Sequence, residues 1–317
     1  MMVTAKTIGF DRFGDVDVFE ERTGEIALNS TNNVLVKVKK VGINPVEAFV
    51  RSGKMSRSAA PAQFHVLGNE VVGEVVKLYD NASNLSIGDN VIVKPGAGGY
   101  ADYLTTNARN VFKVPAEMPL DFAAGFSATA STAYWALYGG FYDLKKGDTL
   151  AVVGASGSVG NFVVQLAKSF DVTIIALASA HNEAYLKESG ANVFIDYRDS
   201  DAVAAYANKA DFVVDASLFN KGEKVALQLV KEGGTYLGMT TLPQDTLGKN
   251  VKVVFLSRTP AMTNAVVMPF LFKFYEEHGL TLKIAETLPL TVAGVQEAHR
   301  LIVSDRAAGK IILTTED

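Results

Sequence analysis

From about residue 150 onward, short apolar runs alternate with longer amphipathic runs. The apolar runs predict β-strands, and the runs between them place apolar side chains at helical spacing. Regular alternation of strand and helix is typical of βαβ units, so this half of the chain predicts an α/β fold with a doubly wound, parallel six-stranded sheet. The predicted strands are residues 150–153, 172–176, 193–196, 212–215, 234–237 and 251–255, and the predicted helices are residues 160–169, 183–189 and 223–231.

The first third of the chain has a different pattern. Residues 34–41 alternate in the manner of a half-buried strand, and residues 71–78 and 90–94 look similar, with Gly and Asn/Asp turns between them. Short strands joined by turns predict a compact, β-rich, barrel-like domain.

After about residue 262 the strand and helix alternation stops. The pattern predicts helices at residues 266–278 and 295–303 and a last strand at residues 310–314. The simplest organisation returns this tail to the first domain. We therefore expect a discontinuous β-rich domain, residues 1–121 and 263–317, and a dinucleotide-binding domain, residues 122–262.

Composition narrows the class of protein. The 317 residues suggest two domains, and 48% hydrophobic beside 20% charged residues excludes disorder. The net charge of −4 without a Lys/Arg block argues against a nucleic-acid partner. The chain has no cysteine, which excludes disulfides and thiolate chemistry and is compatible with a cytoplasmic location.

Two segments bear on membranes and export. The N-terminus lacks the pattern of a signal peptide, because Asp11 and Arg12 precede any apolar run. Residues 122–142 carry no charge, but Ser, Thr and Gly crowd them and no Lys/Arg asymmetry flanks them. They predict a buried helix, so we expect no membrane partner.

A glycine-rich turn follows the first strand of the alternating half, in the segment LAVVGASGSVGNFVVQLAK. Such glycines permit a tight turn, a close approach of the backbone to a pyrophosphate, and close packing of helix on strand. Free N–H groups at the start of the helix then face the phosphates. The predicted loop residues are Gly154, Ser156, Gly157, Ser158, Val159 and Gly160.

The second strand indicates which dinucleotide binds. In NAD sites an acidic residue about 20 positions beyond the loop binds the ribose hydroxyls, whereas here Ala178 and Ser179 stand in that region. A hydroxyl can donate to a 2′-phosphate that a carboxylate would repel, which predicts NADP(H). Tyr197 and Arg198 are placed to close the same pocket. Ser179 as a plain turn residue, and Arg198 as a surface charge, remain open alternatives.

Several motifs in order give the whole chain a family resemblance. They are GINPVEAFVRSG (42–53), LGNEVVGEVV (67–76), IGDNVIV (87–93), GGYADYL (98–104), TAYWAL (132–137), the glycine loop and EAHRLIVSDRAAGKIIL (297–313). With these motifs the chain resembles the medium-chain dehydrogenase/reductase superfamily, in particular its zinc-free quinone oxidoreductase (zeta-crystallin-like) branch. The resemblance implies a GroES-like β-rich domain, a Rossmann domain and a homodimer.

The resemblance also bears on zinc. Zinc alcohol dehydrogenases of this superfamily hold the metal with a Cys, a His and a further thiolate. The corresponding positions here include Asn44 and Asn69, and the chain has no cysteine. We therefore predict no metal, and hydride transfer from the nicotinamide to an acceptor that is already electrophilic.

Further site residues follow from the resemblance. Asn44 and Thr132 are the predicted catalytic residues, because the family places such residues beside the nicotinamide and its ribose. The alternative for both is a backbone-capping or packing role. Arg306 is a candidate for the adenosine phosphate, as is Lys310, for which a solvated surface charge is the better interpretation. Ser217 and Phe255 complete the predicted cofactor-binding set.

The predicted function is therefore NADPH-dependent reduction of a quinone, a small hydrophobic electrophile. Phe49 stands where relatives often have Tyr, so a phenolic proton donor is missing, which favours a quinone. Glu47 is more in keeping with a structural role. The alternatives are a reductase of α,β-unsaturated carbonyls and a non-catalytic NADPH-binding protein.

Overall fold

The computed structural model describes residues 1–79, 84–259, 262–304, 307 and 309–315. Contacts within the chain group Met1–Ala128 with Lys283–Asp317 in a first unit, and Thr129–Leu282 in a second. The sequence pattern predicts these borders at 121/122 and 262/263. The borders differ because the first part of helix α2 (Leu120–Tyr138) groups with the first unit, whereas α7 (Asn264–His278) groups with the second.

The second unit is built on one parallel sheet. Its strand order is β11-β10-β9-β12-β13-β14, so the sheet grows outward in both directions from β9 and β12. All six predicted strands and the predicted fold class are confirmed; the short helix α5 was not predicted. The elements are β9 (Thr149–Val153), α3 (Ser158–Ala167), β10 (Thr173–Ala178), α4 (Glu183–Ser189), β11 (Val193–Asp196), α5 (Ser200–Ala205), β12 (Ala210–Asp215), α6 (Glu223–Leu229), β13 (Val230–Gly238) and β14 (Lys252–Phe255).

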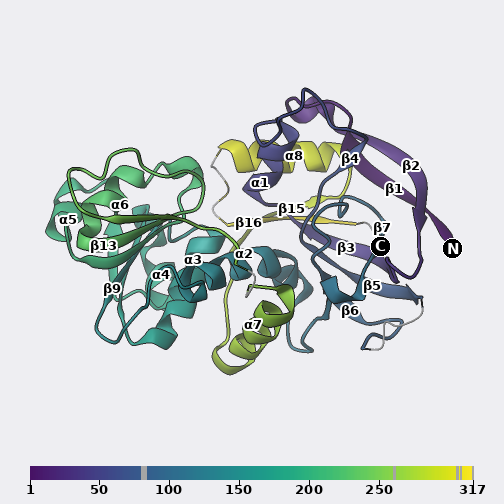
Figure 1. Cartoon of the computed structure of the whole chain (residues 1–317). Coiled ribbons are helices and arrows are strands. Elements are labelled where there is room, and N and C mark those ends of the chain that lie inside the picture. The colour runs from purple at the N-terminus through teal and green to yellow at the C-terminus, as the bar shows by residue number, and fades with distance from the viewer. Residues whose placement is uncertain (80–83, 260–261, 305–306, 308, 316–317) are drawn as a thin grey trace. The chain divides into compact units, whose positions relative to one another are not determined.

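The central strands of this sheet are apolar because helices cover them. In β9 every residue after Thr149 is buried. Successive side chains point to opposite faces, so Ala151 and Val153 enter a core with residues of α5 and α6, while Leu150 and Val152 face the other side. The helices form two pairs, α3 with α4 and α5 with α6, that pack on the sheet (Figure 1).

The first unit holds two sheets that are largely antiparallel. One has the order β2-β1-β4, and the other has the order β15-β16-β3-β5-β6-β8 with β7 also paired to β3. The elements are β1 (Met2–Phe10), β2 (Glu20–Ala27), β3 (Val34–Gly42), α1 (Pro45–Arg51), β4 (His65–Val66), β5 (Val71–Leu78), β6 (Asn90–Val93), β7 (Tyr103–Thr106), β8 (Val111–Lys113), β15 (Ile284–Pro289), α8 (Val292–Ser304) and β16 (Lys310–Thr314).

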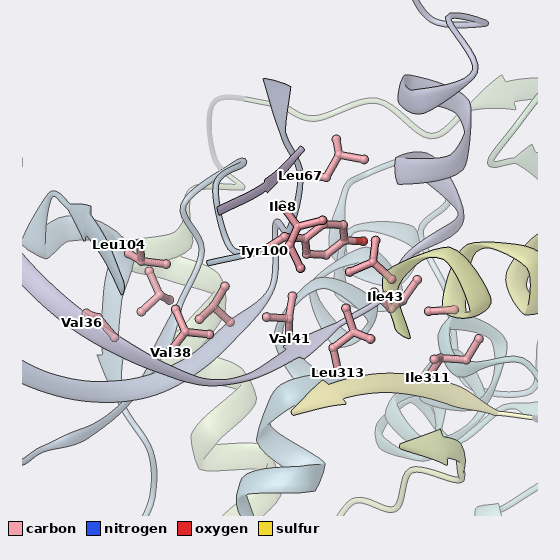
Figure 2. Close-up of a cluster of buried hydrophobic side chains, with 14 of the residues drawn as sticks. Ile8, Val36, Val38, Val41, Ile43, Leu67, Tyr100, Leu104, Ile311 and Leu313 are labelled. Carbon is pink, nitrogen blue, oxygen red and sulfur yellow. The ribbon is translucent and has the colours of Figure 1, made fainter. Parts of the chain in front are cut away.

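The C-terminal tail belongs to the first unit. Strand β16 pairs with β3, with Ile312 opposite Gly42, so the yellow strand β16 lies beside β3, from an early part of the chain, in Figure 1. Figure 2 shows the apolar core that this pairing closes, where side chains of β3 and β16 gather beside the ring of Tyr100. This return of the tail brings Lys310 next to residues from the first quarter of the chain.

The uncharged segment at residues 122–142 forms most of α2, which ends at Tyr138. Ala123, Ala124, Phe126, Ser127, Ala130 and Ser131 are buried in it. In the part of the chain that the structure describes, no helix is both long enough and apolar enough to cross a bilayer.

Candidate functional site

The glycine loop lies at the carboxyl end of β9, and two of its glycines are required by the fold. Gly154 has a φ of +73°, and a Cβ there would lie 2.8 Å from the backbone nitrogen of Ser217. A Cβ on Gly160 would lie 2.4 Å from the carbonyl oxygen of Gly154. These two glycines let α3 start directly against the strand.

The third glycine has a different role. Gly157 precedes α3 and is exposed, and a Cβ there would meet only the Gly154 carbonyl, at 3.3 Å. The first N–H groups of a helix have no acceptor within the helix and carry a partial positive charge. The start of α3, directly after Gly157, therefore presents hydrogen-bond donors. Ser156, Ser158 and Val159 are only partly buried around this opening. The loop therefore fits the pyrophosphate of a dinucleotide.

A buried carboxylate holds Ser217 against this loop. Asp215, at the end of β12, accepts a hydrogen bond from the Ser217 backbone at 3.0 Å and from the Tyr236 hydroxyl at 2.9 Å. The Ser217 hydroxyl in turn accepts from the backbone of Gly222 at 2.8 Å. Burial raises the pKa of Asp215. Asp215 is not among the residues predicted from the sequence, although an acidic residue at the end of an apolar strand is a usable signal.

The predicted adenosine end is assembled from two neighbouring strands. Ser179 follows β10 and Tyr197 follows β11, and their hydroxyls lie 3.5 Å apart. The Arg198 guanidinium lies 5.1 Å from the centre of the Tyr197 ring. The structure thus brings together three residues that the sequence assigned to one pocket.

The other predicted residues are more dispersed. Phe255 ends the edge strand β14 and is 44% exposed, and Thr132 is half-buried in α2. Arg306 lies outside the described residues. Asn44 belongs to the first unit.

In the first unit, Asn44 belongs to a buried polar cluster rather than to an open surface. The Lys310 ammonium donates to Asn44 Oδ1 at 2.8 Å and to Glu70 Oε2 at 2.7 Å. Lys310 is 2% exposed and Glu70 is fully buried. The interpretation of Lys310 as a solvated charge is therefore wrong, because the pairing of β16 with β3 draws its side chain inside.

The amide of Asn44 extends this cluster to Asn69, since its Nδ2 donates to Asn69 Oδ1 at 3.0 Å. The other carboxylate oxygen of Glu70, Oε1, accepts hydrogen bonds from the backbone N–H of Ala128 at 2.6 Å and from the Ser127 hydroxyl at 3.2 Å. The amides of Asn44 and Asn69 stand at two positions where the resemblance implies metal ligands in the zinc enzymes, and the Lys310 ammonium lies beside Asn44. In the described ranges no three His, Cys, Asp or Glu side chains come together as a metal site, and an ammonium repels a cation.

A second buried carboxylate, Glu47, ties the loops around this cluster together. Its oxygens accept from the backbones of Asn44, Gly68 and Asn69 at 2.9, 2.9 and 3.2 Å. The Tyr100 hydroxyl donates to it at 3.2 Å and also lies 3.0 Å from His299 Nε2. Burial raises the pKa of Glu47 to about 6 despite these hydrogen bonds.

His299 is a further buried titratable group in this chain of contacts. Its ring is fully buried, 4.8 Å from the ring centre of Phe19. Burial lowers the pKa of His299 to about 3, and the positive charge of Arg51 acts in the same direction. The folded protein therefore keeps this imidazole neutral.

We expect His299 to make the protein less stable as the pH falls. Below about pH 6.5 the His299 side chain is protonated in the unfolded chain but stays neutral in the folded chain. The free energy of unfolding therefore falls by about 1.4 kcal/mol per pH unit on acidification from about pH 6.5. His299→Phe removes this proton uptake. Between pH 7 and pH 4.5 the free energy of unfolding of the variant therefore rises by about 3 kcal/mol relative to that of the wild type. Urea titrations at several pH values measure this difference, and parallel stability curves would contradict it.

Comparison with known proteins agrees with this architecture. Residues 30–116 match the family described as alcohol dehydrogenase GroES-like domain, and residues 189–313 match the family described as zinc-binding dehydrogenase. The quinone oxidoreductase of Homo sapiens is 28% identical over 256 residues, which cover 76% of this chain and 77% of the relative. The 2-methylene-furan-3-one reductase of Solanum lycopersicum is 28% identical over 321 residues, which cover 97% of this chain and 78% of the relative.

Solved structures share the fold over nearly the full length. The quinone oxidoreductase from Coxiella burnetii superimposes with a TM-score of 0.82 at 26% identity, covering 99% of this chain and 100% of the other. An Escherichia coli quinone oxidoreductase complexed with NADPH gives a TM-score of 0.83 at 22% identity, covering 98% and 99%.

The two matched domains and the glycine loop define a dehydrogenase-type oxidoreductase. The chain belongs to the medium-chain dehydrogenase/reductase superfamily, in its quinone oxidoreductase branch. The resemblance predicted from the motifs is confirmed, including the GroES-like domain.

Proposed function

We propose that this protein is a zinc-independent oxidoreductase that transfers hydride from NADPH to a quinone. NADPH, the quinone and one proton give NADP⁺ and the hydroquinone; the hydride carries both electrons and water supplies the proton. The observation that carries the proposal is the Asn44–Lys310–Glu70 cluster, because the resemblance implies a zinc ligand at position 44 and the Lys310 ammonium beside Asn44 would repel a metal cation. The human and Coxiella burnetii relatives, both named quinone oxidoreductases, support the substrate class.

In this proposal the cofactor lies along the carboxyl edge of the parallel sheet. The start of α3 and the loop residues receive the pyrophosphate, with Ser217 beside Gly154. Ser179 and Tyr197 receive the 2′-phosphate end, and Phe255 and Thr132 receive the nicotinamide half. Asn44, in the first unit, is kept as a proposed catalytic residue. The Escherichia coli relative complexed with NADPH supports the choice of NADP(H).

Substituting Ser179→Asp tests the choice between NADPH and NADH. A carboxylate there repels the 2′-phosphate, so we expect NADPH affinity to fall by at least tenfold while NADH affinity changes much less. Binding of both nucleotides is measured by titration of cofactor fluorescence. Equal weakening of both would remove Ser179 from the pocket. Ser86→Asp, in an exposed turn of the other unit, is the matched control.

The activity is tested by following NADPH oxidation with an ortho-quinone in excess chelator, with NADH in parallel. Rapid NADPH-selective turnover that the chelator does not reduce is the expected result. Turnover lost with the chelator would overturn zinc independence. NADPH binding without turnover on any electrophile would indicate a non-catalytic protein.

A second candidate function is reduction of an α,β-unsaturated carbonyl. The tomato relative named 2-methylene-furan-3-one reductase favours it. Hydride would then add to the β-carbon, and a proton to the α-carbon. Comparison of turnover on an enone and on a quinone under the same conditions decides between the two.

The remaining proposals concern assembly and location. We propose a homodimer in the cytoplasm, as the resemblance and the cysteine-free composition imply. Sedimentation of the purified protein and fractionation of cells test them.

A further inference from the structure

The cluster around Lys310 determines which way the amide of Asn44 points. An ammonium has donors only, so the atom of Asn44 that lies 2.8 Å from Lys310 Nζ is the oxygen. Asn44 Nδ2 then faces acceptors only, namely Asn69 Oδ1 at 3.0 Å, Glu70 Oε2 at 3.3 Å and the Gly42 carbonyl at 3.3 Å. Each contact is consistent with one amide orientation.

The orientation of the Asn44 amide also determines that of the Asn69 amide. Because Asn44 Nδ2 is a donor, the atom of Asn69 that it meets is Oδ1, and the Asn69 NH₂ group is directed away from the cluster. Asn69 is only partly buried, and among the residues that the structure describes its Nδ2 has no hydrogen-bond partner. Asn69 thus presents an unused donor.

The backbone beneath Asn69 is held in place from two sides. Glu47 Oε1 accepts from the backbones of Gly68 and Asn69. Gly68 has a φ of +95°, and a Cβ there would lie 2.6 Å from the Cα of Gly99. A donor on such a constrained loop is oriented before a ligand arrives.

We propose that the Asn69 NH₂ group is the donor that binds the carbonyl oxygen of the electrophile. The inference rests on the proposed function. As the hydride and its electron pair reach the quinone, one oxygen gains negative charge until water protonates it. Asn69 donates to that oxygen, and the positive charge of Lys310, transmitted through two aligned amides, strengthens the donor. The group therefore selects ligands with a carbonyl or phenolate oxygen.

The kinetic test replaces Asn69 with Leu, which is similar in size and cannot donate. We expect kcat to fall by about 100-fold with a smaller change in KM, since one donor to a developing oxyanion contributes about that much. NADPH affinity and the melting temperature should match those of the wild type. Asn250→Ala, an exposed residue whose side chain makes no hydrogen bond in the described structure, is the control.

A binding test separates this inference from the proposed function. The probe is 4-nitrophenolate, a coloured mimic of the hydroquinone monoanion, titrated into the protein with NADP⁺ at several pH values. A donor favours the charged form, so the bound phenol should ionise about one pH unit lower in the wild type than in Asn69→Leu.

The kinetic test and the binding test distinguish a failure of the proposed function from a failure of the inference about Asn69. If the wild type does not reduce quinones, the proposed function is wrong, while an Asn69-dependent ionisation of the bound phenol still supports the donor site. If the wild type is active but Asn69→Leu changes kcat less than threefold, the inference is overturned. Nitrophenolate that fails to bind, or that ionises alike in both proteins, also overturns it.

Discussion

Lys310→Met lowers the free energy of unfolding by about 3 to 5 kcal/mol, because it leaves the Glu70 carboxylate buried without its partner. Lys310 is only 2% exposed, Glu70 is fully buried, and their charged atoms lie 2.7 Å apart. A buried charge that loses its counter-charge keeps its desolvation cost and loses the attraction that offset it. Urea denaturation followed by circular dichroism at pH 7 measures the loss.

Two further variants make this result specific. Glu70→Gln combined with Lys310→Met removes both charges, so the double variant should be more stable than Lys310→Met alone. Lys187→Met breaks an ion pair with Glu183 in which both side chains are at least half exposed, and it should change stability by less than about 0.5 kcal/mol. If Lys310→Met behaves like Lys187→Met, the buried pair does not exist in solution.

Gly157→Val raises the dissociation constant for NADPH by at least about 100-fold while the protein stays folded. The Cβ of residue 157 fits, with one contact at 3.3 Å, but the valine methyl groups fill the space above the first turn of α3. A pyrophosphate would then lose both its room and its contacts with the helix N–H groups. A non-glycine residue before the helix costs stability only modestly, about 1 kcal/mol.

Calorimetric titration with NADPH, together with a melting curve, tests this result. Gly24→Val is the matched control, because a Cβ on this exposed strand glycine meets nothing within 4 Å. Gly160→Val should behave differently and unfold the protein more readily, since its Cβ would overlap the Gly154 carbonyl. Unchanged NADPH affinity in a folded Gly157→Val protein would show that the loop does not bind the pyrophosphate.

Some elements were predictable because their signals are local. The central strands of the parallel sheet contain mostly apolar residues, such as Leu150 to Val153, since helices cover both faces. The strands of the first unit were recognised only in part. Strand β2, for example, is mostly exposed and reads GluGluArgThrGlyGlu, without the alternation that marks a half-buried strand.

The polar cluster of the candidate site was less predictable. Asn44 and Lys310 are 266 residues apart, and nothing near Lys310 in the chain distinguishes it from a surface lysine. Asp215 carried a local signal at the end of its strand, but its partner Tyr236 lies on another strand. The donor on Asn69 follows only from the orientation of two neighbouring amides.

The sequence by itself determined the parallel sheet, the glycine loop, the missing carboxylate at Ser179 and the missing cysteine ligands, and through its motifs the family. These properties depend on residue types and on short spacings along one segment. Only the tertiary structure decided that Lys310 is buried against Glu70, that Asn44 is hydrogen-bonded through both atoms of its amide, and that Asn69 Nδ2 has no partner among the described residues. The physical reason is that the burial and orientation of a polar side chain depend on partners from distant segments, which meet when β16 pairs with β3.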